Sequence, residues 1–151
     1  MRIHSVKSVF LGAALVVAGI ASAQDGDLRK VTSPFTEEFD HKIGQTLNLD
    51  LRVDGIKWTL IKTSAGNRAD WEDGRDTKTT FTTELENLTD TPRIFSIIVL
   101  LEDERGRQLD RVELKGIKAK PGKFVKDVQK IKIDGALLSD ISKVYIFAEV
   151  Q

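Results

Sequence analysis

The chain has no cysteine, and this absence excludes two kinds of chemistry. Without cysteine there is no disulfide and no thiolate to act as a nucleophile or a metal ligand. Histidine is nearly as scarce, because only His4 and His41 occur in 151 residues, and His4 falls in a leader segment discussed below. One remaining histidine rules out most zinc sites. We therefore predict no metal and no cofactor, and interpret His41 as an ordinary surface or helix residue.

The chain also lacks an excess of charge and any catalytic signature. Its 23 basic and 23 acidic residues balance, so nothing favours a nucleic-acid partner. A Ser-His-Asp site would depend on His41, but no nucleophile motif of the Gly-x-Ser-x-Gly type is present. A glycosidase would need two carboxylates at a fixed separation in a cleft, which a sequence does not reveal. The expectation is a protein that is not an enzyme.

Long hydrophobic runs are also few, and the clearest one is near the N-terminus. Val9–Ile20 is apolar, follows the basic residues Arg2 and Lys7, and precedes Ala21-Ser22-Ala23. This is the anatomy of a secretory signal peptide, and the run is too short to span a bilayer comfortably. We predict a signal peptide over residues 1–23, a periplasmic or secreted protein, and no membrane span after cleavage. An uncleaved membrane anchor is the alternative.

Residues 46–63 show the strongest local pattern. Apolar residues alternate with polar ones on both sides of Asp54-Gly55. An Asp-Gly pair between two alternating strands is typical of a two-residue hairpin, because both positions must accept a positive φ. Closing the hairpin there predicts three apolar cross-strand pairs on one face: Val53 with Ile56, Leu51 with Trp58, and Leu49 with Leu60.

Arg93–Asp103 contains the most apolar run outside the leader and is rich in β-branched residues. Its two alternating faces are both apolar, which predicts a central strand buried on both sides. Further strand patterns recur between turn signals. Together with the hairpin, the predicted strands are 46–53, 56–63, 78–86, 93–103, 108–115, 124–133 and 144–150. A bulge is expected in strand 124–133, because its alternation is imperfect. About seven short strands predict an all-β, immunoglobulin-like β-sandwich over residues 46–151.

Residues 24–45 are predicted to form an N-terminal arm. Ser33 can cap a helix, Pro34 suits the first helical position and Gly44 can end it. Phe35, Phe39 and Ile43 are spaced by four and would share one face of that helix. A short helix is therefore expected near the mature N-terminus, with an irregular strand as the alternative.

Part of the chain resembles a known family. Residues 79–133 contain Glu84-Leu85-Glu86-Asn87, then Ile97-Ile98-Val99-Leu100-Leu101-Glu102-Asp103-Glu104-Arg105-Gly106, then Pro121-Gly122 and a strand starting at Phe124. This arrangement resembles the FxLYD-type domains, which are small immunoglobulin-like sandwiches of exported bacterial proteins. Leu101 and Asp103 match the name-giving motif, whereas Val99 and Glu102 stand where aromatic residues are usual. The resemblance implies a fold and an envelope setting, and it carries no functional residues.

The loop 64–77 holds the first candidate for ligand binding. Its acidic and aromatic side chains could bind calcium through carboxylate oxygens or stack on a sugar ring; they are Asp70, Trp71, Glu72, Asp73 and Asp76. The spacing around Gly74 does not match an EF-hand, because Ala69 falls at the first ligand position. The alternative is structural, with Trp71 folding back to cover one end of the sandwich.

Lysines in the second half of the chain form the other candidate surface, and those singled out are Lys118, Lys120, Lys123, Lys126 and Lys130. They could present a basic face to an acidic partner. Alternatively, they protect the edge of a sheet against strand-to-strand aggregation. With no catalytic set, the sequence predicts a protein-interaction or scaffolding domain that binds an unidentified envelope or extracellular protein. Calcium or carbohydrate binding through the 70–76 loop is the alternative function.

Overall fold

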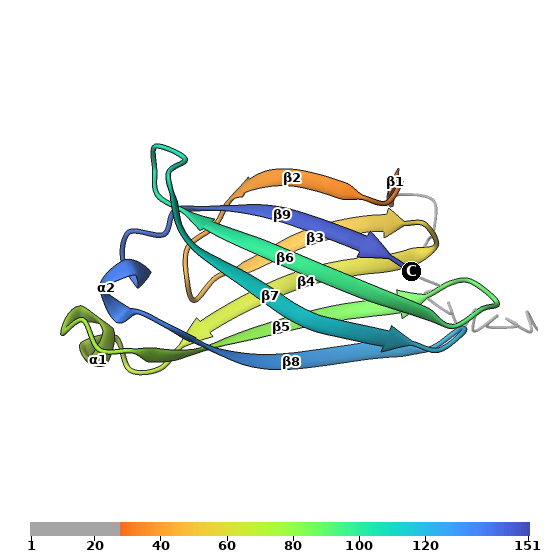
Figure 1. The fold of residues 1–151 in the computed structure, drawn as a ribbon. Coiled ribbons are helices and arrows are strands. Elements are labelled where there is room, and N and C mark those ends of the chain that lie inside the picture. The colour runs from red at the N-terminus through yellow and green to blue at the C-terminus, as the bar shows by residue number, and fades with distance from the viewer. Residues whose placement is uncertain (1–27) are drawn as a thin grey trace, which may run out of the picture.

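In residues 28–151, which a computed structural model of the chain describes, two β-sheets pack against each other (Figure 1). Sheet A has the strand order β1 (Arg29–Val31), β3 (Thr46–Val53), β4 (Ile56–Ala65), β5 (Thr77–Asn87) and β8 (Phe124–Ile133). Sheet B has the order β2 (Phe35–Asp40), β9 (Lys143–Val150), β6 (Arg93–Glu102) and β7 (Gln108–Ala119). Two short helices, α1 (Arg68–Glu72) and α2 (Gly135–Leu138), lie together at one end. The predicted signal peptide lies outside the described residues.

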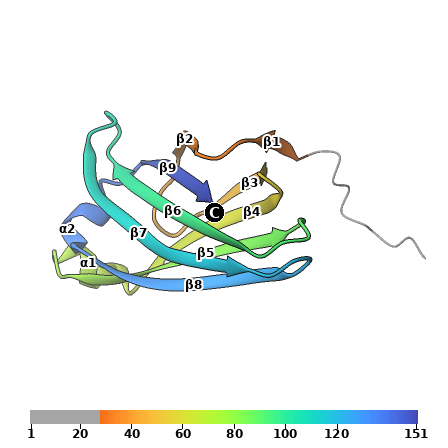
Figure 2. The same ribbon diagram turned by 45° about the vertical axis from the view of Figure 1, so that its right-hand side comes forward.

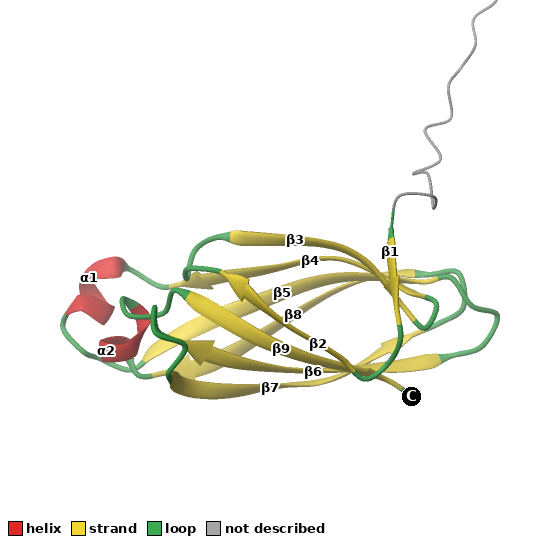
Figure 3. Cartoon of the chain, turned by 90° about the horizontal axis from the view of Figure 1, so that it is seen from above, coloured by secondary structure: helices red, strands yellow, loops and turns green. Residues whose placement is uncertain are grey.

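The expected all-β sandwich is confirmed, with its core between the two sheets. Figure 3 shows the two layers from above, with both helices at one end and the C-terminus at the other. Trp58 of sheet A meets Phe95 of sheet B edge-on, with ring centroids 5.0 Å apart. The Trp58 indole N–H donates to the Thr83 hydroxyl over 2.8 Å, so its one polar atom is satisfied inside the core.

The helix predicted near the mature N-terminus is wrong. Residues 35–40 form strand β2, which pairs with β9 in register Phe35 to Ala148 and Phe39 to Val144. The sandwich therefore begins at β1 rather than at residue 46. The spacing of four that suggested a helix is also compatible with a strand, because positions two and four apart share one face.

The Asp54-Gly55 hairpin forms as predicted near its turn and differs farther away. Val53 pairs with Ile56 and Leu51 with Trp58, but Asn48 instead of Leu49 pairs with Leu60. A bulge between Asn48 and Leu51 shifts the register, and Asp50 within it has a positive φ of 47°. Leu49, Leu51 and Val53 of β3 are still buried, but on β4 Ile61 is buried in place of Leu60. The bulge expected in β8 is absent, because β8 pairs with β5 in one unbroken register.

Strand β6 is a central strand, but only one of its faces is buried. Phe95, Ile97, Val99 and Leu101 face sheet A and are at most 1% exposed. On the opposite face Ile98 and Leu100 are only half-buried, and Ile94 is 40% exposed. The expectation of burial on both faces is therefore wrong.

Polar side chains connect the two sheets. His41, which follows β2, is buried, and its Nε2 lies 2.8 Å from the Thr63 hydroxyl of β4, so its assignment to the surface or a helix is wrong. Burial lowers the pKa of His41. On the opposite side, where Figure 2 draws β7 beside β8, the Gln129 side chain accepts from the Lys115 N–H and donates to the Lys115 carbonyl. Gln129 thus bonds to the backbone of an edge strand and occupies groups that would otherwise be free for pairing.

Candidate functional site

Residues 64–77, which were predicted as a loop, instead contain the end of β4 and helix α1, and this segment packs onto the end of the sandwich. Trp71 is half-buried against the core, and its indole N–H is buried without a partner among the described residues. Gly135 of α2 packs on this loop and donates its N–H to the Arg75 carbonyl over 3.0 Å. A side chain at position 135 would lie 2.2 Å from that carbonyl, so the contact requires glycine. This is the arrangement that the structural interpretation of Trp71 predicted.

The carboxylates of this loop do not converge. All four are exposed, namely Asp70, Glu72, Asp73 and Asp76. Two of them form ion pairs with different basic residues. Glu72 pairs with Arg68 at 2.7 Å, and Asp76 pairs with Lys132 of β8 at 2.8 Å. Within residues 28–151 no group of three or more acidic, histidine or cysteine side chains is placed to hold a metal ion. Ligand binding by this loop stays a prediction without geometric support.

The predicted lysine surface is divided between different parts of the sandwich. Lys118 lies on the outer face of sheet B, Lys126 and Lys130 lie on the outer face of sheet A, and Lys120 and Lys123 lie in the turn between β7 and β8. Both β7 and β8 are edge strands. This placement suits edge protection, because lysines on an edge oppose pairing with another chain.

Two exposed apolar side chains alternate with the lysines of β8. Phe124 is 58% exposed and Val128 is 52% exposed. They lie four residues apart, or about 13 Å along a strand. Their neighbours across the strand on β5 are Glu86 and Thr82. Because polar groups surround each of them, they do not form a continuous apolar surface.

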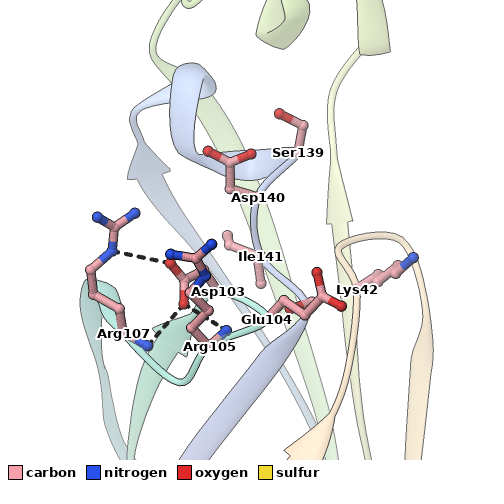
Figure 4. A pocket seen from close by; sticks show the side chains of 9 residues that line it. Lys42, Asp103, Glu104, Arg105, Arg107, Ser139, Asp140 and Ile141 are labelled. Carbon is pink, nitrogen blue, oxygen red and sulfur yellow. Dashed lines mark hydrogen bonds and ion pairs between the residues drawn. The ribbon is translucent and has the colours of Figure 1, made fainter.

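A pocket lies at the end of the sandwich beside the β6–β7 turn (Figure 4). It has a volume of about 530 Å³ and a mixed lining of three cationic and three anionic side chains: Lys42, Arg105, Arg107, Asp103, Glu104 and Asp140. Asp103 is engaged by the turn itself, since it accepts from the backbone N–H groups of Arg105 and Arg107. These bonds lower the pKa of Asp103. The pocket therefore presents charges of both signs.

A further apolar surface is the outer face of sheet B, although the sequence predicted that both faces of β6 are buried. Tyr145 and Phe147 of β9 are half-buried and lie directly beside Leu100 and Ile98 of β6, respectively. These four side chains, which we call the outer apolar cluster, form two adjacent cross-strand pairs on the two middle strands. No helix or strand of residues 28–151 covers them, because α1 and α2 lie at the end of the sandwich (Figures 1 and 3).

The two outer strands of this face carry opposite charges. Strand β2 presents Glu38 and Asp40, whereas β7 presents Arg111, Lys115 and Lys118 with one acid, Glu113. We call these the acidic flank and the basic flank. An apolar centre between charged flanks is the usual organisation of a protein-binding surface, with an apolar core and a polar rim.

A buried carboxyl lies at one end of this face. Glu102 of β6 is 8% exposed, and one of its oxygens has no hydrogen-bond partner among the described residues. Burial is the main cause that raises the pKa of Glu102, and the neighbouring Glu38 carboxylate raises it further. Glu38 also binds the Lys143 ammonium at 3.0 Å, and this contact raises the pKa of Lys143. The charges at this end are thus held in fixed positions.

Comparison with known proteins assigns no family to the chain. No protein-family model matches it, and no curated protein matches its sequence significantly. The resemblance to FxLYD-type domains therefore stays a prediction. In the part of the chain that the structure describes, no helix has the length and apolarity needed to cross a membrane.

Proposed function

We propose that this chain is a non-enzymatic, exported, immunoglobulin-like domain of the FxLYD type, which binds another protein in the periplasm or outside the cell. The observation that carries the proposal is the outer apolar cluster. Ile98, Leu100, Tyr145 and Phe147 form an unbroken apolar area on the middle of a sheet. Contiguous apolar surface is one of the features that mark interaction sites.

The rest of the described chain supports binding rather than catalysis. The pocket beside the β6–β7 turn combines charges of both signs, and two carboxylates of the acidic segment, Glu72 and Asp76, form separate ion pairs. The apolar cluster also contains two aromatic side chains, Tyr145 and Phe147, and aromatic residues are enriched at the centres of interfaces. A protein partner uses such a surface better than a small ligand does, because small-ligand sites are concave.

Affinity capture with matched surface variants tests this proposal. The bait is the exported protein carrying an affinity tag, used against envelope extract. Ile98→Arg places a charge in the outer apolar cluster, and Thr80→Arg places the same charge on the outer face of sheet A. We expect a captured partner to be lost with Ile98→Arg and retained with Thr80→Arg. Equal capture by the two variants, or no capture above background by the unmodified bait, would contradict the proposal.

A further inference from the structure

The outer face of sheet B has an apolar centre and carries opposite charges on its two outer strands. One row of aligned residues crosses all four strands: Glu38 pairs with Tyr145, Tyr145 with Leu100, and Leu100 with Arg111. The row therefore reads acid, apolar, apolar, base from β2 to β7. Glu38 pairs with Lys143 of its own chain and Arg111 with Glu113, but 45% of the Glu38 side chain and 51% of the Arg111 side chain stay exposed, so both are accessible to a partner.

The spacing of the strands makes this row self-complementary. Neighbouring strands lie about 4.8 Å apart, so β2 and β7 are each about 7 Å from the midline between β9 and β6. A two-fold axis along that midline places a second copy face to face on the first. It then superimposes the acidic flank of one copy on the basic flank of the other, and β9 on β6.

We infer that this face binds a second copy of the same chain and forms a two-fold symmetric dimer. In this dimer Tyr145 of one copy lies over Leu100 of the other, Phe147 lies over Ile98, and Glu38 lies over Arg111. Each of these contacts occurs twice, as an isologous interface requires. Two sheets packed in this way resemble the aligned packing inside a β-sandwich, in which strands cross at about −30°.

Charge complementarity distinguishes this arrangement from the other two-fold choice. An axis across the strands would place β2 on β2 and β7 on β7, so that Glu38 would meet Glu38 and Arg111 would meet Arg111. Like charges placed opposite each other oppose association. The inference rests on the proposed function, because it identifies the partner of the same face.

Charge reversal tests the dimer and its axis together. Glu38→Arg and Arg111→Glu each create two repulsive contacts in a homodimer. In an equimolar mixture of the two variants, both contacts of the mixed dimer join opposite charges. Lys130→Glu, on the outer face of sheet A, is the matched control. The masses are measured by sedimentation velocity over a concentration series, and thermal melts show that each variant is folded.

We expect the unmodified protein and Lys130→Glu to dimerise with the same Kd. Each reversal should weaken the homodimer at least about tenfold, since like charges in an interface are strongly unfavourable. The mixture of the two reversals should restore a dimer that contains one copy of each. If both single variants dimerise like the unmodified protein, or if the mixture stays monomeric, the arrangement is overturned.

The same series separates this inference from the proposed function. The inference fails if the unmodified protein is a monomer up to about 100 µM, well above the micromolar Kd of weak interfaces of standard size. If Ile98→Arg then still loses a captured partner that Thr80→Arg retains, the face binds a different protein and the proposed function stands. If capture also fails, both are overturned.

Discussion

Substitution of Asn87 by alanine should destabilise the fold more than any other single polar truncation at the β5–β6 end. Asn87 ends β5 and has no exposed surface. Its Nδ2 donates to the carbonyls of Thr91 and Ala119 at 2.8 and 2.9 Å, and its Oδ1 accepts from the backbone N–H and the hydroxyl of Thr89. One side chain thus joins the β5–β6 connection to the end of β7.

The magnitude follows from these four bonds. A hydrogen bond inside a protein contributes about 1 kcal/mol, and a buried group left without a partner costs about 1–3 kcal/mol. The Ala119 carbonyl loses the Asn87 donor in a buried setting, and the Thr91 carbonyl loses one of two donors, because the Thr89 hydroxyl also donates to it over 3.0 Å. Thr89 itself is only partly buried. We therefore expect Asn87→Ala to lower the free energy of unfolding by about 3 kcal/mol. For a domain of this size that corresponds to a fall in Tm of about 10 °C.

Urea denaturation followed by the fluorescence of the two tryptophans, Trp58 and Trp71, measures this effect. Asn87→Asp keeps an acceptor for Thr89 but removes both donors, so it should cost at least as much as alanine. The control is Asn67→Ala, because Asn67 caps α1 through one long bond of 3.4 Å in an exposed position. It should cost less than about 1 kcal/mol. Equal losses for Asn87→Ala and Asn67→Ala would refute the reasoning.

Three further predictions concern single side chains. Glu102→Gln should raise stability at pH 7, because burial and Glu38 raise the pKa of Glu102 and so penalise its charged form in the folded state. The unmodified protein should gain stability as the pH falls from 7 towards 5, and the variant should not; a variant that gains as much stability as the unmodified protein would contradict this. Burial lowers the pKa of His41, so the unfolded chain binds the proton first and the unmodified protein should lose stability as the pH falls below about 6.5. His41→Gln should remove this loss, which is measured by the urea midpoints at pH 7 and pH 5. Gln129→Ala should speed hydrogen exchange at the Lys115 amide, because the Lys115 N–H donates to the Gln129 Oε1 over 2.7 Å. An unaltered exchange rate would show that the amide is protected by other means.

Local pattern predicted the sandwich because its core strands obey a simple alternation. Thr79, Phe81, Thr83 and Leu85 alternate along β5, which was expected as a strand over residues 78–86, and all four are buried. The Asp54-Gly55 turn also fixed the pairs nearest to it. Farther from the turn, the bulge at Asp50 shifts the register. The position of a bulge depends on tertiary packing, so the alternation of apolar and polar residues does not reveal it.

Strand β2 shows where local pattern failed. Its helix signals were real, but the chain gains more by pairing β2 with β9 than by closing a single helical turn, since most helical stability comes from tertiary packing. Strand pairing turns Glu37 towards the half-buried side, where Arg29 of β1 forms an ion pair with it. That compensation comes from a neighbouring strand, so the residues of β2 alone could not predict it.

The candidate site was missed for a related reason. Ile98 and Leu100, with Tyr145 and Phe147, have the composition of a buried layer, and an interface centre has the same composition. Alternation shows that both faces of a strand are apolar, but it does not say which face the rest of the chain covers. The topology decides this, because sheet A covers one face of β6 and no described element covers the other.

The central claim is that the outer face of sheet B is a protein-binding surface. The most direct measurement is photo-cross-linking in producing cells, with a photoreactive amino acid at position 98 and, as the control, at position 80 on the outer face of sheet A. We expect position 98 to give an adduct of defined mass with another protein chain and position 80 to give none. Absence of an adduct at position 98, or the same adduct from both positions, would contradict it.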